Sequence, residues 1–244
     1  ICLLIKMSFF TKVNRIGSKQ FKLKSFVRYR GNISPSFVEL ETPNKKITLT
    51  AGDLFFRSIK RNNVKHAFIY SGGAIMPWVD KFYKSDIDYF VNTHEQNSGH
   101  SLTGYSKSLF NHDKKAIVLT TSGPGFTNLV TPMLDMKNDS TPGVFITGQV
   151  PLNAVGSNAF QEAPSVDISK HVTKYSTQIK SILDIEYKID KAFEIAYSGK
   201  MGPVHLDIPK CVATEEINEA EYKLLKNEDN SIDFSRIQNS NPIT

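Results

Sequence analysis

Apolar residues come in short runs along the middle of this chain of 244 residues, and turn-forming residues separate the runs. Within each run the apolar side chains are largely consecutive and do not alternate with polar ones. That pattern is typical of strands buried on both faces of a parallel sheet. The runs that we interpret as strands are 65–70, 87–93, a run starting at Ala116, 143–149 and 203–209.

Helical periodicity fills the segments between these runs. Thr50 can cap a helix whose apolar residues Leu54, Phe55 and Ile59 recur at helical spacing. A later helix is predicted over 184–199, where isoleucine and phenylalanine mark one apolar side. Strands that alternate with helices in this way predict an α/β fold, a doubly wound parallel sheet with helices on both faces.

Glycine-rich or polar turns follow four of the predicted strands. They are SGG at 71–73, THEQ at 93–96, TSGPG at 121–125 and TGQVP at 147–151. In open parallel sheets, ligands bind at the carboxyl ends of the strands. The sequence therefore predicts a binding domain whose site is built from these turns.

The net charge of +6 is unevenly distributed along the chain. Residues 1–30 hold eight Lys or Arg and no Asp or Glu, which leaves 22 basic and 24 acidic residues from 31 onward. A folded body with this balance lacks the basic surface that nucleic-acid binding requires, so we expect no nucleic-acid partner. We interpret 1–46 as a basic extension and linker, with a composition typical of an organellar transit peptide, or of a plain basic tail.

Order is expected to begin at residue 47, so 47–213 forms the predicted domain. From 214 to 244 the chain turns acidic and polar, and we interpret it as a tail or the start of a linker. Two distant cysteines argue against a disulfide framework or a structural zinc site. No apolar run reaches the roughly 18 residues that a membrane span needs.

The segment 94-HEQNSGH-100 places Glu95 between two histidines and raises the question of a metal site. A zincin helix needs its histidines four residues apart so that both project from one face. Here the spacing is six, and no third ligand follows nearby, so no metal is expected. The glycine turns match neither a phosphate-binding loop nor a nucleophile elbow. From the residues alone Glu95 is either a functional carboxylate at a strand end or an ordinary helix-start acid.

Eight segments in order resemble one family, the large catalytic subunit of acetolactate synthase, a thiamine-diphosphate enzyme. They are YSGGAIMP at 70–77, HEQNSGH at 94–100, TSGPGFTNLVTPM at 121–133, TGQVP at 147–151, GSNAFQEA at 156–163, VTKYS at 172–176, AFEIAYSGK at 192–200 and GPVHLDIPK at 202–210. The resemblance covers roughly 48–213 and implies the family's N-terminal, pyrimidine-binding domain.

The resemblance implies a role for Glu95. In the family this glutamate hydrogen-bonds N1′ of the cofactor's aminopyrimidine and favours the tautomer whose 4′ nitrogen removes the thiazolium proton. Gly72 and Gly73 would let the backbone approach the pyrimidine, and Pro124 and Asn128 match the second cofactor loop.

Other matched positions carry weaker assignments. Those that match the family's substrate channel are Val150, Phe160, Gln161 and Lys210, although Val150 and Phe160 could also be core and Lys210 a surface charge. Pro151 and Lys174 match its inhibitor-contacting rim.

Several positions depart from the family's pattern, among them Lys200, Ser71 and Phe126. Lys200 stands where the family has an FAD-contacting arginine, and lysine lacks the guanidinium fork, which puts FAD in doubt. Ser71 replaces a proline, and Phe126 replaces a small residue and is expected to crowd the pyrimidine pocket.

The family's Mg²⁺ and diphosphate site lies in a further domain whose GDG…NN motif does not occur in these residues. We therefore expect the N-terminal part of an acetolactate synthase, which joins pyruvate to a second 2-ketoacid in branched-chain amino-acid synthesis. On its own it should be inactive and should pair as a homodimer or with a partner carrying the diphosphate-binding domain. The alternatives are one subunit of a split thiamine-diphosphate enzyme, or a non-catalytic binding or regulatory relic. A mitochondrial location is expected, with plastid or cytoplasm as alternatives.

Overall fold

The computed structural model describes residues 12–16, 20–24, 48–109 and 113–227, which belong to two units, Ile1–Lys45 and Lys46–Thr244. In the first unit β1 (Lys12–Ile16) and β2 (Gln20–Lys24) pair as antiparallel strands. Most of the predicted 1–46 extension, including its linker portion 31–46, lies outside the described residues. The transit-peptide interpretation therefore stays a prediction.

The second unit is built on a six-stranded sheet in which every neighbouring pair is parallel. The spatial order is β5-β4-β6-β7-β9-β8. The strands are β4 (Val64–Tyr70), β5 (Asp88–Val91), β6 (Lys115–Thr120), β7 (Gly143–Gln149), β8 (Tyr175–Gln178) and β9 (Pro203–Pro209). The predicted fold class is confirmed, and the five predicted strands correspond to β4, β5, β6, β7 and β9.

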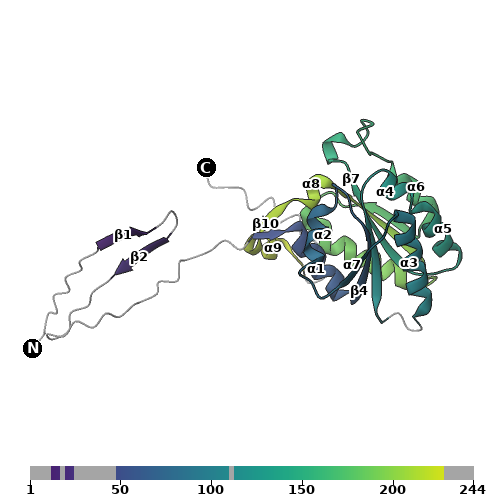
Figure 1. The fold of residues 1–244 in the computed structure, drawn as a ribbon, viewed down its shortest axis with the longest axis horizontal. Coiled ribbons are helices and arrows are strands. Elements are labelled where there is room, and N and C mark those ends of the chain that lie inside the picture. Colours follow the sequence, from purple (N-terminus) through teal and green to yellow (C-terminus); the bar gives the residue numbers. More distant parts are fainter. Residues whose placement is uncertain (1–11, 17–19, 25–47, 110–112, 228–244) are drawn as a thin grey trace, which may run out of the picture. The chain divides into compact units, whose positions relative to one another are not determined.

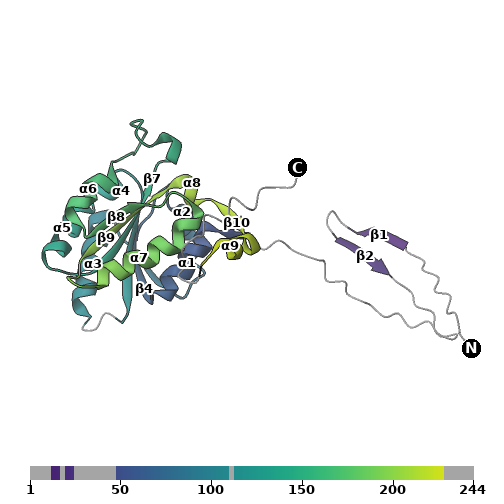
Figure 2. The same cartoon turned by 180° about the vertical axis from the view of Figure 1, so that it is seen from behind.

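Helices cover both faces of this sheet (Figures 1 and 2). On one face lie α1 (Ala51–Arg61), α2 (Met76–Phe82) and α7 (Ile185–Tyr197), and on the other α3 (Glu95–Ser108), α5 (Val130–Asn138) and α6 (Ser165–Val172). Successive residues of β6 explain the continuous apolar pattern. Ile117 and Leu119 belong to the core cluster on the first face, and Ala116 and Val118 to the cluster on the second. Each face of the strand is buried, so neither accepts polar residues.

The first helix begins as the sequence predicts. Thr50 caps α1 by accepting the N–H of Asp53, and the Asp53 carboxylate accepts the N–H of Thr50 in return. This reciprocal capping box satisfies two backbone donors that a helix start would otherwise leave unpaired.

The folded domain continues past residue 213, which corrects the expected boundary. β10 (Glu216–Asn218) pairs antiparallel with β3 (Thr48–Thr50), and α9 (Glu219–Leu225) follows it. Tyr222 and Leu225 of α9 are buried against the domain. Residues 214–227 are therefore part of the fold, and 228–244 lie outside the described residues.

Several short elements complete the described chain. They are α4 (Pro124–Thr127), α8 (Lys210–Ala213) and the 3-10 turns η1 (Leu152–Ala154) and η2 (Ile182–Asp184). Within the described residues no helix combines the length and the apolar character that a membrane crossing would require.

Candidate functional site

The strand order places a topological switch point at β4. From β4 the chain crosses to β5 on one side, and later continues with β6 on the other. The turns that leave these three neighbouring strands therefore meet at the carboxyl edge of the sheet. Such a point, where loops diverge, is the usual ligand crevice of a doubly wound sheet.

Glu95 is the first residue of α3, and its side chain is buried, with 6% exposed. Asn128, which follows α4, donates from Nδ2 to Glu95 Oε2 at 2.9 Å. Oε1 of Glu95 receives no hydrogen bond from the part of the chain that the structure describes. The resemblance assigned both residues to one cofactor, and the structure brings them together from opposite sides of β4.

The two histidines of 94-HEQNSGH-100 are not arranged around Glu95 as metal ligands. His94 caps α3, because its Nδ1 accepts the N–H of Gln96 at 3.1 Å. His100 lies exposed on the helix, six residues after His94. Across 48–109 and 113–227, no three His, Cys, Asp or Glu side chains gather in a way that could hold a metal ion.

The two glycines after β4 have different surroundings. A Cβ on Gly72 would lie 2.4 Å from Cβ of Thr121, so only glycine allows this turn to pack against the turn after β6. A Cβ on Gly73 would meet nothing within 4 Å. The backbone at Gly73 therefore borders open space, and its role toward a cofactor stays a prediction.

The loop after β7 reaches the turn after β6. Gly123 has a φ of 59°, and a Cβ there would lie 2.7 Å from the carbonyl oxygen of Gln161. Pro124 beside it is exposed. Gln161 itself has a φ of 59°, and Phe160 is 89% exposed. Phe160 is thus not a core residue, and it lies on the loop that contacts the turn after β6.

The remaining residues of the substrate and rim assignments lie in three places. Val150 and Pro151 follow β7 at the carboxyl edge, where Val150 is buried. Lys210 is the exposed first residue of α8, at the carboxyl end of β9. Lys174 precedes β8 at the amino edge, where its backbone N–H binds the Pro203 carbonyl at 2.8 Å.

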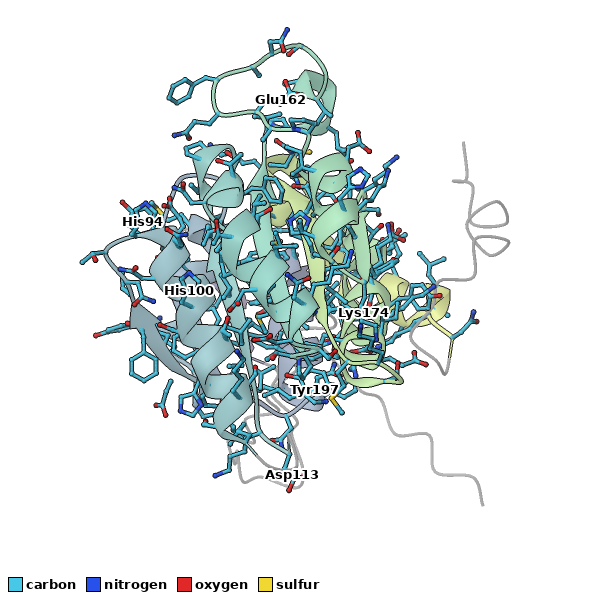
Figure 3. The ribbon with its side chains drawn as sticks, turned by 90° about the vertical axis from the view of Figure 1, so that its right-hand side faces the viewer. His94, His100, Asp113, Glu162, Lys174 and Tyr197 are labelled. Carbon is cyan, nitrogen blue, oxygen red and sulfur yellow. The ribbon has the colours of Figure 1, made fainter. Side chains whose placement is uncertain are left out.

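Within one chain Lys174 therefore does not lie beside Pro151. Its ammonium group donates to the carbonyl oxygens of Ile195 and Ser198 at the end of α7. Figure 3 shows Lys174 well away from Glu162, which lies on the projecting loop after β7. Lys200, in the turn between α7 and β9, is exposed at the same amino edge. It therefore lies at the opposite edge of the sheet from Glu95 and Asn128.

Phe126 differs from expectation. Its side chain is fully buried in the core cluster beneath α3, α5 and α6, and its ring centroid lies 5.0 Å from that of His205 on β9. The ring fills the core and not the open space above the turn. His205 is completely buried, and burial lowers its pKa to about 3, so it stays neutral.

Two acidic residues near the site were missed by the sequence argument. Glu162 closes the loop after β7, and its carboxylate accepts backbone N–H groups of that loop. Asp207 on β9 is buried, and burial raises its pKa to about 6 against a hydrogen bond from Gln178 that lowers it. For Glu162 the sequence offered one signal, because residues 151–162 contain no other charged residue.

Comparison with known proteins gives the family. The family described as "Thiamine pyrophosphate enzyme, N-terminal TPP binding domain" matches residues 49–170. The chain belongs to this family. The matched range contains the Glu95–Asn128 pair and the glycine turns after β4 and β6.

Individual relatives of this thiamine pyrophosphate enzyme domain are acetolactate synthases. The chain is 42% identical over 198 residues to "Acetolactate synthase, mitochondrial" of Schizosaccharomyces pombe, covering 79% of this chain and 29% of the relative. It is 46% identical over 167 residues to "Acetolactate synthase catalytic subunit, mitochondrial" of Saccharomyces cerevisiae, covering 68% and 24%. With "Acetolactate synthase large subunit" of Lactococcus lactis it shares 38% over 183 residues, covering 75% and 30%. The chain thus spans between 24% and 30% of the length of these relatives.

The residues at this edge fit the pyrimidine half of thiamine diphosphate. A buried carboxylate with one oxygen held by an amide and the other without a described partner can share a proton with a ring nitrogen. The backbone at Gly73 leaves room for a flat ring to approach. Glu95, Asn128 and Gly73 are the residues that would hold that ring.

Proposed function

We propose that this chain is the pyrimidine-binding part of an acetolactate synthase. The observation that carries the proposal is the hydrogen bond from Asn128 to the buried Glu95, at the switch point of a thiamine pyrophosphate enzyme domain. The acetolactate synthase relatives, with 38% to 46% identity, support this activity over other thiamine-dependent reactions.

When bound, thiamine diphosphate supplies the carbanion chemistry that decarboxylates pyruvate and joins the remaining two carbons to a second 2-ketoacid. Glu95 would hold a proton between its Oε1 and the ring nitrogen N1′. Asn128 fixes the carboxylate by binding its other oxygen, so the group keeps one orientation. Burial keeps water from competing for that proton.

The loop after β7 supplies the substrate side of this proposal. Val150, Phe160 and Gln161 lie on or next to that loop, and Lys210 lies at the end of the neighbouring β9. These residues would contact the 2-ketoacids. Mg²⁺ and the diphosphate group would be held by a partner that carries the diphosphate-binding domain, and FAD through Lys200 is not part of the proposal.

A mitochondrial location is proposed as well. The Schizosaccharomyces pombe and Saccharomyces cerevisiae relatives are both named as mitochondrial. The eight basic residues and the absence of acidic ones in residues 1–30 are consistent with a targeting segment.

The test is reconstitution of the chain with a polypeptide that carries the diphosphate-binding half of an acetolactate synthase. Acetolactate formed from pyruvate is measured with added thiamine diphosphate and Mg²⁺. We expect Glu95→Gln to lower the rate by roughly 10²- to 10⁴-fold, the range of acid–base contributions. Glu194→Gln is the matched control, because Glu194 is an exposed glutamate of α7 far from this edge.

The outcomes separate the alternatives. An active wild-type pair with an unaffected Glu95→Gln variant would remove the proton-sharing role. Activity only with the partner of a different thiamine-diphosphate enzyme would favour the split-enzyme alternative. No cofactor binding and no activity with any such partner would favour the non-catalytic relic.

A further inference from the structure

The loop between β7 and α6 projects from the carboxyl edge of the sheet (Figures 1 and 3). We refer to residues 151–162 as the projecting loop. Most of its residues are exposed, among them Val155 at 43% and Phe160 at 89%. An exposed segment of this length with an uncovered phenylalanine needs something other than a hydrophobic core to give it a fixed shape.

One buried side chain holds the two ends of the projecting loop together. Gln149, the last residue of β7, accepts the N–H of Val150 at its Oε1 at 2.9 Å. Its Nε2 donates to the carbonyl oxygen of Ala163 at 2.8 Å and to Ser165 Oγ at 3.3 Å. The residues just before and just after the loop are thereby fixed to the same amide, so the base of the loop is closed.

A second side chain organises the projecting loop from inside. The Glu162 carboxylate accepts the N–H of Gly156 at Oε1 and the N–H of Ala159 at Oε2, the latter at 3.0 Å. Gly156 and Asn158 both have positive φ, at 87° and 57°, which turns successive backbone N–H groups toward one point. Because residues 151–162 hold no Lys, Arg or His, backbone groups take the place of a cation.

The protonation behaviour of Glu162 agrees with this geometry. The hydrogen bond from the Gly156 backbone, followed by those from Ala159, Asn158 and Ser157, lowers its pKa below the ordinary glutamate value. The carboxylate is therefore ionised at neutral pH and able to accept all of these donors.

The shape of the projecting loop bears on the candidate site, because Glu162 directly follows Phe160 and Gln161. The Gln161 main chain lies against Gly123 of the turn after β6, where a Cβ would meet it at 2.7 Å. A change in the backbone at 156–162 therefore moves the side chains proposed to meet the substrate and presses on the turn that precedes Asn128.

We propose that Glu162 is a positioning residue that fixes the projecting loop and so presents Phe160 and Gln161 to the 2-ketoacid. The part of this role that concerns the 2-ketoacid rests on the proposed function. The part in which Glu162 fixes the shape of the loop does not depend on that function. Glu162 acts through backbone groups and touches neither cofactor nor substrate.

The first experiment uses the full chain and needs no activity. Amide hydrogen exchange over 155–160 is compared for wild type, Glu162→Ala, Glu162→Gln and Asp167→Asn. Asp167 is a nearby exposed acid whose side chain pairs only with Lys170 among the described residues, so it serves as the matched control. We expect exchange to accelerate at least tenfold in Glu162→Ala and less in Glu162→Gln, which keeps one accepting oxygen. Unchanged exchange in Glu162→Ala would overturn the proposal.

The second experiment uses the chain reconstituted with a diphosphate-binding partner and measures acetolactate formation. Glu162→Ala should lower kcat/KM for the 2-ketoacid by roughly 10- to 100-fold, mainly through KM, because misplaced contact residues weaken substrate positioning. The concentration of thiamine diphosphate that gives half-maximal activity should not change, since Glu95 and Asn128 are untouched. Faster loop exchange with an unchanged kcat/KM would overturn the positioning role. A wild-type pair without acetolactate formation would defeat the proposed function, and the exchange data would then decide whether Glu162 fixes the loop.

Discussion

At the scale of single residues, Gly72 and Gly73 are adjacent in sequence and unequal in structure. Gly72 lies where a Cβ would overlap the side chain of Thr121, and Gly73 borders open space. Sequence alone gives two equivalent glycines. Their difference arises because only one of them faces the turn of the neighbouring strand.

Substitution by alanine should separate the two glycines. Gly72→Ala is expected to lower the free energy of unfolding by roughly 1–3 kcal/mol, the usual cost of forcing an extra group into packed space. Gly73→Ala should change it by less than about 0.5 kcal/mol, as for most open positions. Urea unfolding of both variants provides the measurement. Equal losses in the two would contradict the packing described here.

A buried acid on β9 should make stability depend on pH in an unusual direction. The pKa of Asp207 rises from 3.8 to about 6 through burial, so the native state binds more protons than the unfolded state between these values. The free energy of unfolding therefore falls as the pH rises through this window and levels off above it. A shift of about two pKa units corresponds to about 3 kcal/mol.

Asp207→Asn removes this titration and keeps a similar shape. The difference in the free energy of unfolding, variant minus wild type, should rise as the pH rises from 4 to 7. The total rise should be up to about 3 kcal/mol. Chemical denaturation at several pH values measures the difference. Asp80→Asn, at an exposed position of α2, should show no such trend. A constant difference between Asp207→Asn and wild type would contradict the raised pKa.

At the scale of secondary-structure elements, α9, the last helix of the described residues, is held through one buried carboxylate of α7. Glu186 Oε2 accepts from Tyr222 Oη and Lys226 Nζ, both at 2.6 Å, and Oε1 accepts from Arg61 of α1 at 3.1 Å. Burial would raise the pKa of Glu186, but the hydrogen bonds from Lys226 and Tyr222 outweigh it and lower the pKa overall. The carboxylate therefore joins three helices.

Removal of one donor should loosen this junction. Tyr222→Phe is expected to cost about 1–3 kcal/mol, because it takes away a hydrogen bond to a charged group and leaves the ring in place. Thermal or urea unfolding is the measurement. Glu221→Gln, at an exposed position of the same helix, should stay within about 0.5 kcal/mol of wild type. If Tyr222→Phe behaved like this control, α9 would not be part of the cooperative fold.

The elements that sequence patterns found are those with apolar runs, and the ones missed are polar. β8 reads YSTQ and has no apolar run, because as an edge strand it is only half covered. α9 lies in an acidic stretch that suggests a tail, and its two buried residues, Tyr222 and Leu225, are too few to show a period. Tertiary contacts with Glu186 decide its structure, and those come from 36 residues away.

The arrangement of the candidate site was predictable in part for a related reason. Strand periodicity placed the turns at one edge, and the resemblance named Glu95 and Asn128, which the structure joins by a hydrogen bond. The separation of Lys174 from Pro151 could not be read from residue order, because it depends on which end of a strand each residue adjoins. Glu162 was missed because its partners are backbone groups, and the sequence shows only that no other charged residue lies in 151–162.

At the scale of the whole domain, one sheet edge carries exposed apolar side chains. β5 is an edge strand, and Tyr89, Phe90 and Val91 on it are 39%, 50% and 62% exposed. None of the described strands pairs with its outer side. An open edge with apolar residues is a surface on which a second copy or another polypeptide can pair.

We predict that the isolated chain self-associates through this edge. Phe90→Lys should shift the population toward monomer in sedimentation velocity, because a charge on an edge strand opposes pairing. Leu134→Lys, at an exposed apolar position of α5, should leave the association unchanged. A wild-type chain that sediments only as a monomer would contradict the prediction.

The pairing of β3 with β10 has a mechanical consequence. Thr48 lies opposite Asn218 and Thr50 opposite Glu216, so the strand that begins the domain runs antiparallel to one near its end. A force applied to the chain before Thr48 therefore breaks the hydrogen bonds between β3 and β10 one pair at a time. It does not load all of them in shear at once. β3 and β10 form a sheet of their own, so the six parallel strands are not part of this pairing. A force applied from the N-terminal side should therefore detach β3 at low force. The six-stranded sheet, at whose edge Glu95 lies, should stay folded until α1 unfolds.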